Sequence, residues 1–61
     1  MNASEVEFDE TLTAATLDGK TVLVDWFDAD EHGMITEFRA VDGRVFDVSR
    51  EGSQAFAKLR G

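Results

Sequence analysis

Leu17-Asp18-Gly19-Lys20 decides the fold, because the pattern recurs 24 residues later as Val41-Asp42-Gly43-Arg44. Each copy lies between runs of alternating β-prone residues. An Asp-Gly pair in that setting is a strong signal for a β-hairpin, since glycine accepts the positive φ that a tight turn requires. The repeat therefore predicts two hairpins, with turns at 17–19 and 41–43.

The alternation of side chains around these turns predicts the strand register. It favours a three-residue loop in each hairpin, with the glycine in the left-handed conformation. The first loop then sets Ala14 opposite Val22, and the second sets Phe38 opposite Phe46. The register matters because a slip of one residue would turn every side chain of a strand to the other face.

Period-two alternation also predicts which faces are buried. From Glu5 to Thr16 the even positions are mostly apolar, with Glu10 as the exception, so we expect one long strand with a bend near Asp9-Glu10. In the next strand Val22 and Val24 are in phase with Trp26. This phase predicts that Trp26 lies in the core.

The tail of the chain carries helix signals. Ser49 is a candidate N-cap, and Glu51 stands in the first turn, where the helix dipole favours an acid. Apolar and small residues follow at helical spacing on one face, namely Gly52, Ala55, Phe56 and Leu59. The tail therefore predicts a helix over about 50–60.

Together these signals predict a single α+β domain over residues 1–61. Two antiparallel β-hairpins form a small curved four-stranded sheet, and one C-terminal helix packs on it. The expected strands span about 5–16, 21–28, 34–40 and 44–48, and the helix spans about 50–60. A small SH3-like barrel is the alternative architecture.

The charge is strongly negative and unevenly distributed. The net charge is −7, from 13 acidic and 6 basic residues. Residues 1–31 hold nine acids and one base, a net of −8, whereas residues 32–61 hold four acids and five bases, a net of +1. Such a field repels nucleic acid and anionic lipid and attracts cationic partners. We therefore expect no direct binding to nucleic acid or membrane.

Cysteine usage and the N-terminus bear on the compartment. The chain contains no cysteine, which favours a reducing environment. Its first residues are acidic, where a signal peptide would be basic and then apolar, and its apolar runs are too short to span a bilayer. The sequence predicts a cytoplasmic protein.

The segment Asp28-Ala29-Asp30-Glu31-His32-Gly33 resembles the opening of an EF-hand calcium loop. His32 stands where that pattern has Asp or Asn, and Arg39 stands where it has the bidentate glutamate. The departures favour a solvated turn that ends in glycine, so we expect no metal, with calcium binding as a hypothesis to test.

Catalytic signals are weak throughout the chain. His32 is the only histidine, and the pattern places no nucleophile beside it. A chain of this size offers little concave volume in which paired carboxylates could act as acid and base. We therefore expect a binding protein without enzymatic activity and without a cofactor.

Acidic residues form the candidate binding site. Glu5, Glu7 and Asp9 alternate along one strand, so their backbone positions lie about 6.6 Å apart, a spacing similar to that of successive phosphates in nucleic acid. The expected register puts further acids on the same face or at the open end of the first hairpin. The candidate partner-binding residues are Glu5, Glu7, Asp9, Asp25, Asp28, Asp30 and Glu31.

This small, acidic chain resembles, at the level of class, the DNA-mimic inhibitors of phages, such as anti-CRISPR proteins and uracil-DNA glycosylase inhibitors. The resemblance covers the whole chain and matches no motif. It implies an inhibitor that occupies a basic nucleic-acid-binding surface on a partner protein. It transfers no residue role to this sequence.

Leu23 and Phe27 support an alternative function. They lie on the face opposite Val22 and Val24 in the expected strand, and could form an apolar patch through which a general adaptor or small subunit binds. The acidity could also reflect halophilic adaptation. The expected oligomeric state is a monomer or a weak homodimer.

Overall fold

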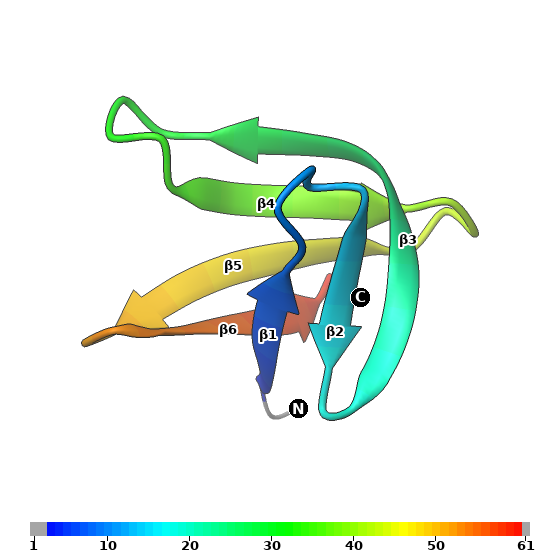
Figure 1. Cartoon of the computed structure of the whole chain (residues 1–61), viewed down its shortest axis with the longest axis horizontal. Coiled ribbons are helices and arrows are strands. Elements are labelled where there is room, and N and C mark those ends of the chain that lie inside the picture. The colour runs from blue at the N-terminus through cyan, green and yellow to red at the C-terminus, as the bar shows by residue number, and fades with distance from the viewer. Residues whose placement is uncertain (1–2, 61) are drawn as a thin grey trace.

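The computed structural model describes residues 3–60 and shows a closed barrel of six antiparallel strands (Figure 1). Each strand pairs with the next along the chain, and β6 pairs with β1 to close the barrel. The strands are β1 (Ser4–Phe8), β2 (Ala14–Leu17), β3 (Lys20–Ala29), β4 (Ile35–Ala40), β5 (Val45–Glu51) and β6 (Gln54–Leu59).

The expected α+β class is therefore wrong, because residues 3–60 contain six strands and no helix. The alternative, a small SH3-like barrel, shares with the structure a closed sheet that has no helical layer. For the same reason, the described part of the chain contains no helix of the length and apolarity that a membrane crossing requires.

The predicted helix over 50–60 is wrong: residues 54–59 form β6, the second strand of the β5–β6 hairpin. β5 runs on to Glu51, a Gly52-Ser53 turn follows, and Glu51 faces Gln54 across it. Ala55 and Ala57 point into the barrel with a period of two, which the helical spacing of the larger apolar residues obscured. A strand here is favoured because β6 pairs with both β5 and β1, which a helix would leave as open sheet edges.

The predicted long strand over 5–16 is in fact two strands, β1 and β2, that pair with each other. Val6 lies opposite Leu17 and Phe8 lies opposite Ala15. The expected bend near Asp9-Glu10 is a complete reversal of the chain, helped by Leu12, whose φ is 59°. The alternation resumed after Glu10, so it indicated a bend and not a complete reversal.

The two Asp-Gly turns differ in length. Leu17 pairs with Lys20, so the first loop has two residues, and Asp18 and Gly19 have φ values of 50° and 83°. Two consecutive positive φ values characterise the type I′ turn, which matches strand twist, so the expected three-residue loop is wrong there. The predicted Phe38–Phe46 pair of the second hairpin is confirmed.

A bulge in β3 reverses the expected position of the tryptophan. Val24 lies opposite Ala40, whereas Trp26 lies opposite Arg39, so Asp25 is an extra residue on β3. Val24 faces the core, and the extra residue turns Trp26 to the outside, where it is 46% exposed. The expected core position of Trp26 is wrong for this reason.

The barrel is closed around three phenylalanines. The Phe38 ring is fully buried; it stacks on Phe46 at 4.9 Å between centroids and meets Phe8 edge-on at 5.4 Å. Inward-facing alanines fill the narrow remaining space, because larger side chains would prevent so small a sheet from closing. They are Ala15, Ala40, Ala55 and Ala57.

Candidate binding surface

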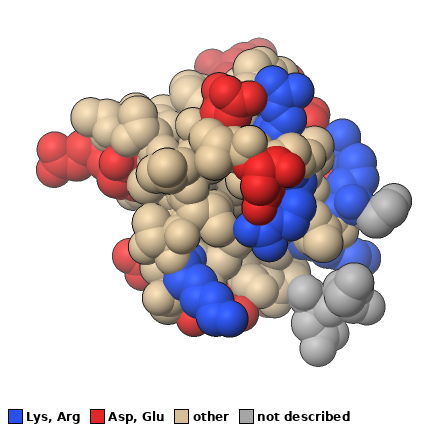
Figure 2. Space-filling view, turned by 90° about the vertical axis from the view of Figure 1, so that its right-hand side faces the viewer, with Lys and Arg blue, Asp and Glu red and all other residues tan. Residues whose placement is uncertain are grey.

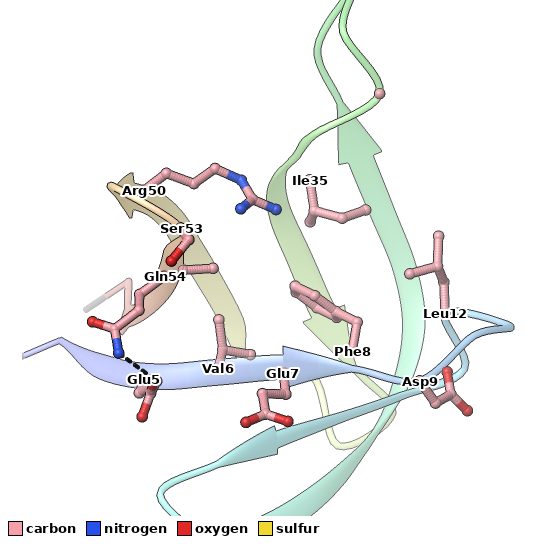
Figure 3. Close-up of a pocket in the computed structure, with 12 residues that line it drawn as sticks. Glu5, Val6, Glu7, Phe8, Asp9, Leu12, Ile35, Arg50, Ser53 and Gln54 are labelled. Carbon is pink, nitrogen blue, oxygen red and sulfur yellow. Dashed lines mark hydrogen bonds between the residues drawn. The ribbon is translucent and has the colours of Figure 1, made fainter.

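Two carboxylates project from the outer face of β1. The strand buries Val6 and exposes Glu5 and Glu7, and Figure 3 shows Val6 and Phe8 on one side of the ribbon and Glu7 on the other. The neighbours of this pair across the sheet are uncharged: Glu7 lies opposite Thr16 and Glu5 lies opposite Phe56. We call Glu5 and Glu7 the β1 acidic face.

Within residues 3–60 neither glutamate takes part in an ion pair. Gln54 Nε2, a neutral donor, gives Glu5 Oε2 its hydrogen bond at 3.0 Å. Three arginines pair with acids on other strands and turns, two basic residues lie at openings of the barrel, and one lies opposite an acid on β5. These residues are Arg39, Arg44, Arg60, Lys20, Arg50 and Lys58.

Asp9 serves the β1–β2 turn. Its Oδ1 accepts hydrogen bonds from the backbone N–H groups of Thr13 and Ala14, at 2.8 and 3.3 Å, and its Oδ2 accepts from the hydroxyls of Thr11 and Thr13. Desolvation acts to raise the pKa of this carboxyl, but the four hydrogen bonds outweigh it and lower the pKa. Both carboxylate oxygens of Asp9 are therefore engaged in the β1–β2 turn, and a partner would have to compete with these hydrogen bonds.

The β3–β4 hairpin carries Asp28, Asp30 and Glu31 at or near its end. Asp30 Oδ1 accepts from the N–H groups of Met34 and His32 at 3.0 and 2.9 Å, and these bonds lower the pKa of Asp30. Asp28 Oδ1 accepts from the N–H of Ala29. Within residues 3–60 no three acidic or histidine side chains converge as a metal site would require.

Asp25 is separated from the β1 acidic face. It lies on β3, on the far side of β2, and its Oδ2 accepts from Arg39 Nη2 at 2.9 Å and Nε at 3.2 Å. A guanidinium that binds the carboxylate in this way neutralises it locally. The structure thus does not place Asp25 beside Glu5 and Glu7.

Acids on β4 and β5 form a charge-balanced ladder with bases on β6 and at the C-terminal end. Asp47 lies opposite Glu37 on one side and Lys58 on the other. The Arg60 guanidinium donates to both Asp47 and Glu37, and this contact lowers the pKa of Asp47 and raises that of Arg60. We call Glu37, Asp47, Lys58 and Arg60 the paired ladder.

A cavity of about 530 Å³ opens between β1, the β3–β4 hairpin and the β5–β6 hairpin. Its walls include Val6, Phe8 and Ile35, and Figure 3 shows Arg50 reaching across the opening toward Ile35. Arg50 follows Phe46 and Val48 at a period of two on β5, so it is on the inner face. The alternation of Phe46, Val48 and Arg50 is visible in the sequence, but the expected helix over 50–60 led us to end the strand at residue 48.

The opposite opening holds the other isolated cation. Lys20 pairs with Leu17, which pairs with Val6, so Lys20 is on the core side of the sheet. It lines a smaller cavity of about 310 Å³ together with Arg44 and Phe46. Lys20 is the only base in residues 1–31, and it points away from the outer face of β1.

The predicted apolar pair, Leu23 and Phe27, does not share a face. Leu23 lies opposite Ala14 on the outer face and is 59% exposed. Phe27 lies opposite the buried Phe38, beyond the bulge, and is 39% exposed. The extra residue at Asp25 separates them, because it reverses the alternation between the two positions.

Comparisons with protein-family models, with curated proteins and with solved structures found no match for this chain. The inference of function therefore rests on where the barrel places its charged and apolar side chains. Two placements are distinctive. The carboxylates on β1 have uncharged residues opposite them, and three large apolar side chains are exposed on the outer face of β3 and directly after β4.

Proposed function

We propose that this chain is a non-enzymatic acidic binding protein whose β1 acidic face occupies a basic, nucleic-acid-binding surface on a partner protein. The observation that carries the proposal is that, within residues 3–60, no base lies opposite Glu5 or Glu7, although the chain has six bases. Uncompensated carboxylates keep their field in solution, whereas those bound by arginine contribute little to it. The β1 acidic face is thus the natural contact for a cationic surface.

The geometry of β1 supports a mimic of the nucleic-acid backbone. Alternate residues of a strand lie about 6.6 Å apart, which sets the backbone positions of Glu5 and Glu7 at a phosphate-like spacing. Pairing with β2 and β6 holds β1 in place, so little conformational entropy is lost when a partner binds. Thr16 and Thr21, whose hydroxyls lie 3.3 Å apart, continue the outer face with small polar groups.

The other candidate acids divide into two roles in this proposal. Glu31 and Asp28, on the β3–β4 hairpin, add to the overall negative field of the chain without lying beside Glu5 and Glu7. Asp9, Asp25 and Asp30 maintain the turns and the bulge through their hydrogen bonds and do not contact the partner directly. An inhibitor of the anti-CRISPR kind, acting in the cytoplasm of a host cell, fits this division.

Competition with nucleic acid tests the proposal. The chain is immobilised, basic proteins are captured from lysate at low salt, and each captured nucleic-acid-binding protein is purified and bound to a fluorescently labelled DNA or RNA. The free chain should displace the labelled strand, and displacement should weaken steeply between low and high salt because the contacts are charge–charge. Capture without displacement of nucleic acid would contradict the mimicry.

A further inference from the structure

Three large apolar side chains lie together on the outer face of the barrel. Leu23, Trp26 and Val41 are 59%, 46% and 61% exposed. The N–H of Val41 donates to the carbonyl of Leu23 at 3.0 Å, and Trp26 lies opposite Arg39, two residues before Val41. We call Leu23, Trp26 and Val41 the β3–β4 apolar patch.

The bulge at Asp25 creates this patch. Without the extra residue, Trp26 would follow Val22 and Val24 toward the core, as the alternation predicts. A bulge is a local device that changes the direction of a side chain. The barrel thus places its only tryptophan on the surface, where a large exposed apolar side chain is typical of an interaction site.

The charges around the patch differ from those on β1. Arg39 pairs with Asp25 at 2.9 Å, and Arg44 pairs with Asp42 at 2.8 Å. Figure 2 views the side of the molecule along which β3 bends, and there Lys and Arg side chains lie beside Asp and Glu side chains. Each of these two carboxylates has a guanidinium next to it, so charge is balanced beside Leu23 and Val41. Beyond Trp26 the outer face is acidic, because Asp28 lies opposite Glu37 and takes part in no ion pair within residues 3–60.

We propose that the β3–β4 apolar patch binds a second copy of this chain. Two copies with a charge of −7 each repel one another, and at the patch this repulsion is reduced because Asp25 and Asp42 are each paired with an arginine. A two-fold axis sets the same surface against itself, and a surface with both signs of charge can then place each guanidinium near a carboxylate of the other copy. Three side chains are few compared with the roughly 20–30 residues per side of a stable complex, so the dimer is transient.

Salt separates this proposal from the function proposed for β1. Screening weakens both the few guanidinium–carboxylate contacts of the patch and the repulsion between two copies of charge −7. The proposal takes the repulsion as the larger of the two, so self-association strengthens as salt rises. Binding of a basic partner to the β1 acidic face weakens under the same conditions. The two proposals can therefore fail independently.

Trp26 supplies a direct measurement, because it is the only tryptophan in the chain. Sedimentation velocity and tryptophan emission are recorded from about 5 µM to about 1 mM, at low and high salt, as mass action requires. The expected result is a shift toward dimer mass with rising concentration, larger at high salt and accompanied by a blue shift of the emission. A monomer with constant emission under all conditions would overturn the proposal.

Variants assign the dimer to the patch. Leu23→Thr/Val41→Thr keeps a strand-favouring residue on β3 and a β-branched side chain at position 41, and it should abolish the blue shift. Met34→Thr is the matched control, since Met34 is 42% exposed and lies outside the patch, and it should dimerise like the wild type. If the double variant loses the wild-type circular dichroism spectrum, Val41→Thr alone gives the test. Equal dimerisation of the folded patch variant and the control would overturn the assignment.

Discussion

The outer face of β1 and the face formed by β4, β5 and β6 both carry acids, but the two faces differ in whether those acids form ion pairs. On β4–β6 the acids of the paired ladder, Glu37 and Asp47, are bound by Arg60. On β1, Glu5 and Glu7 lie opposite a phenylalanine and a threonine. The comparison separates acids that are neutralised across strands, which serve the fold, from acids that form no ion pair within residues 3–60, to which the proposed function assigns the partner contact.

Charge reversal on β1 should have the largest effect on binding. Glu5→Lys/Glu7→Lys should lower the affinity for the partner by about 100-fold or more at low salt, because like charges would then face each other across the contact. The melting temperature should change little, since both side chains lie on the outer face. Titration by fluorescence anisotropy measures the affinity, and a variant that binds like the wild type would remove β1 from the interface.

Acid should act on the supporting carboxylates of the fold. The folded-state pKa values of Asp9, Asp30, Asp42 and Asp47 are lowered by hydrogen bonds. Such groups contribute stability that is fully present above their unfolded pKa, about 3.9, and is lost as the pH falls through the folded values. The melting temperature should therefore decrease when the pH is lowered below about 4. Asp47→Asn should show a smaller decrease over the same pH range than the wild type. A melting temperature that does not depend on pH would contradict this assignment.

Removal of the ladder's arginine should affect stability more than binding. Arg60→Gln leaves Glu37 and Asp47 adjacent without their shared cation, so like charges repel across β4 and β5. The expected result is a lower melting temperature at low salt that recovers partly at high salt, with unchanged partner affinity. If affinity falls as well, the two faces are not separate in function.

The smallest expected effect concerns the cation at the barrel opening. Arg50 lines the same cavity as Glu5 and Glu7, so it opposes the approach of a cationic partner. At a separation of about 10 Å in water, removal of this charge by Arg50→Gln should strengthen binding about two-fold. Arg50→Lys, which keeps the charge, should bind like the wild type; a weaker complex for Arg50→Gln would mean that Arg50 contacts the partner favourably.

Much of the local pattern could be predicted from the sequence, and the errors have physical causes. The Phe38–Phe46 pair followed from the second Asp-Gly turn, because alternation fixed its register. The bulge at Asp25 left no mark in the pattern, because one extra residue changes only the phase after it. The β6 strand was missed because Ala55 and Ala57 are weak apolar signals, although their small size is what lets the barrel close.

The candidate site was predictable in part. The uneven charge between the two halves of the chain indicated the first half, and the outward direction of Glu5 and Glu7 followed from the alternation around Val6. The separate roles of Asp9 and Asp25 were not predictable, because they depend on a chain reversal and on a bulge. Sequence spacing therefore grouped the acids together but could not tell supporting carboxylates from available ones.

The most direct test of the central claim compares two variants that lose the same charge at different places. Glu5→Gln/Glu7→Gln removes two carboxylates from β1, and Asp42→Asn/Glu51→Gln removes two from the β4–β5 turn and the end of β5. Both are titrated against one captured nucleic-acid-binding protein over a range of salt. We predict that the β1 variant loses most of its affinity and salt dependence, while the control keeps both. Equal losses in the two variants would show that net charge alone, not the β1 acidic face, drives binding.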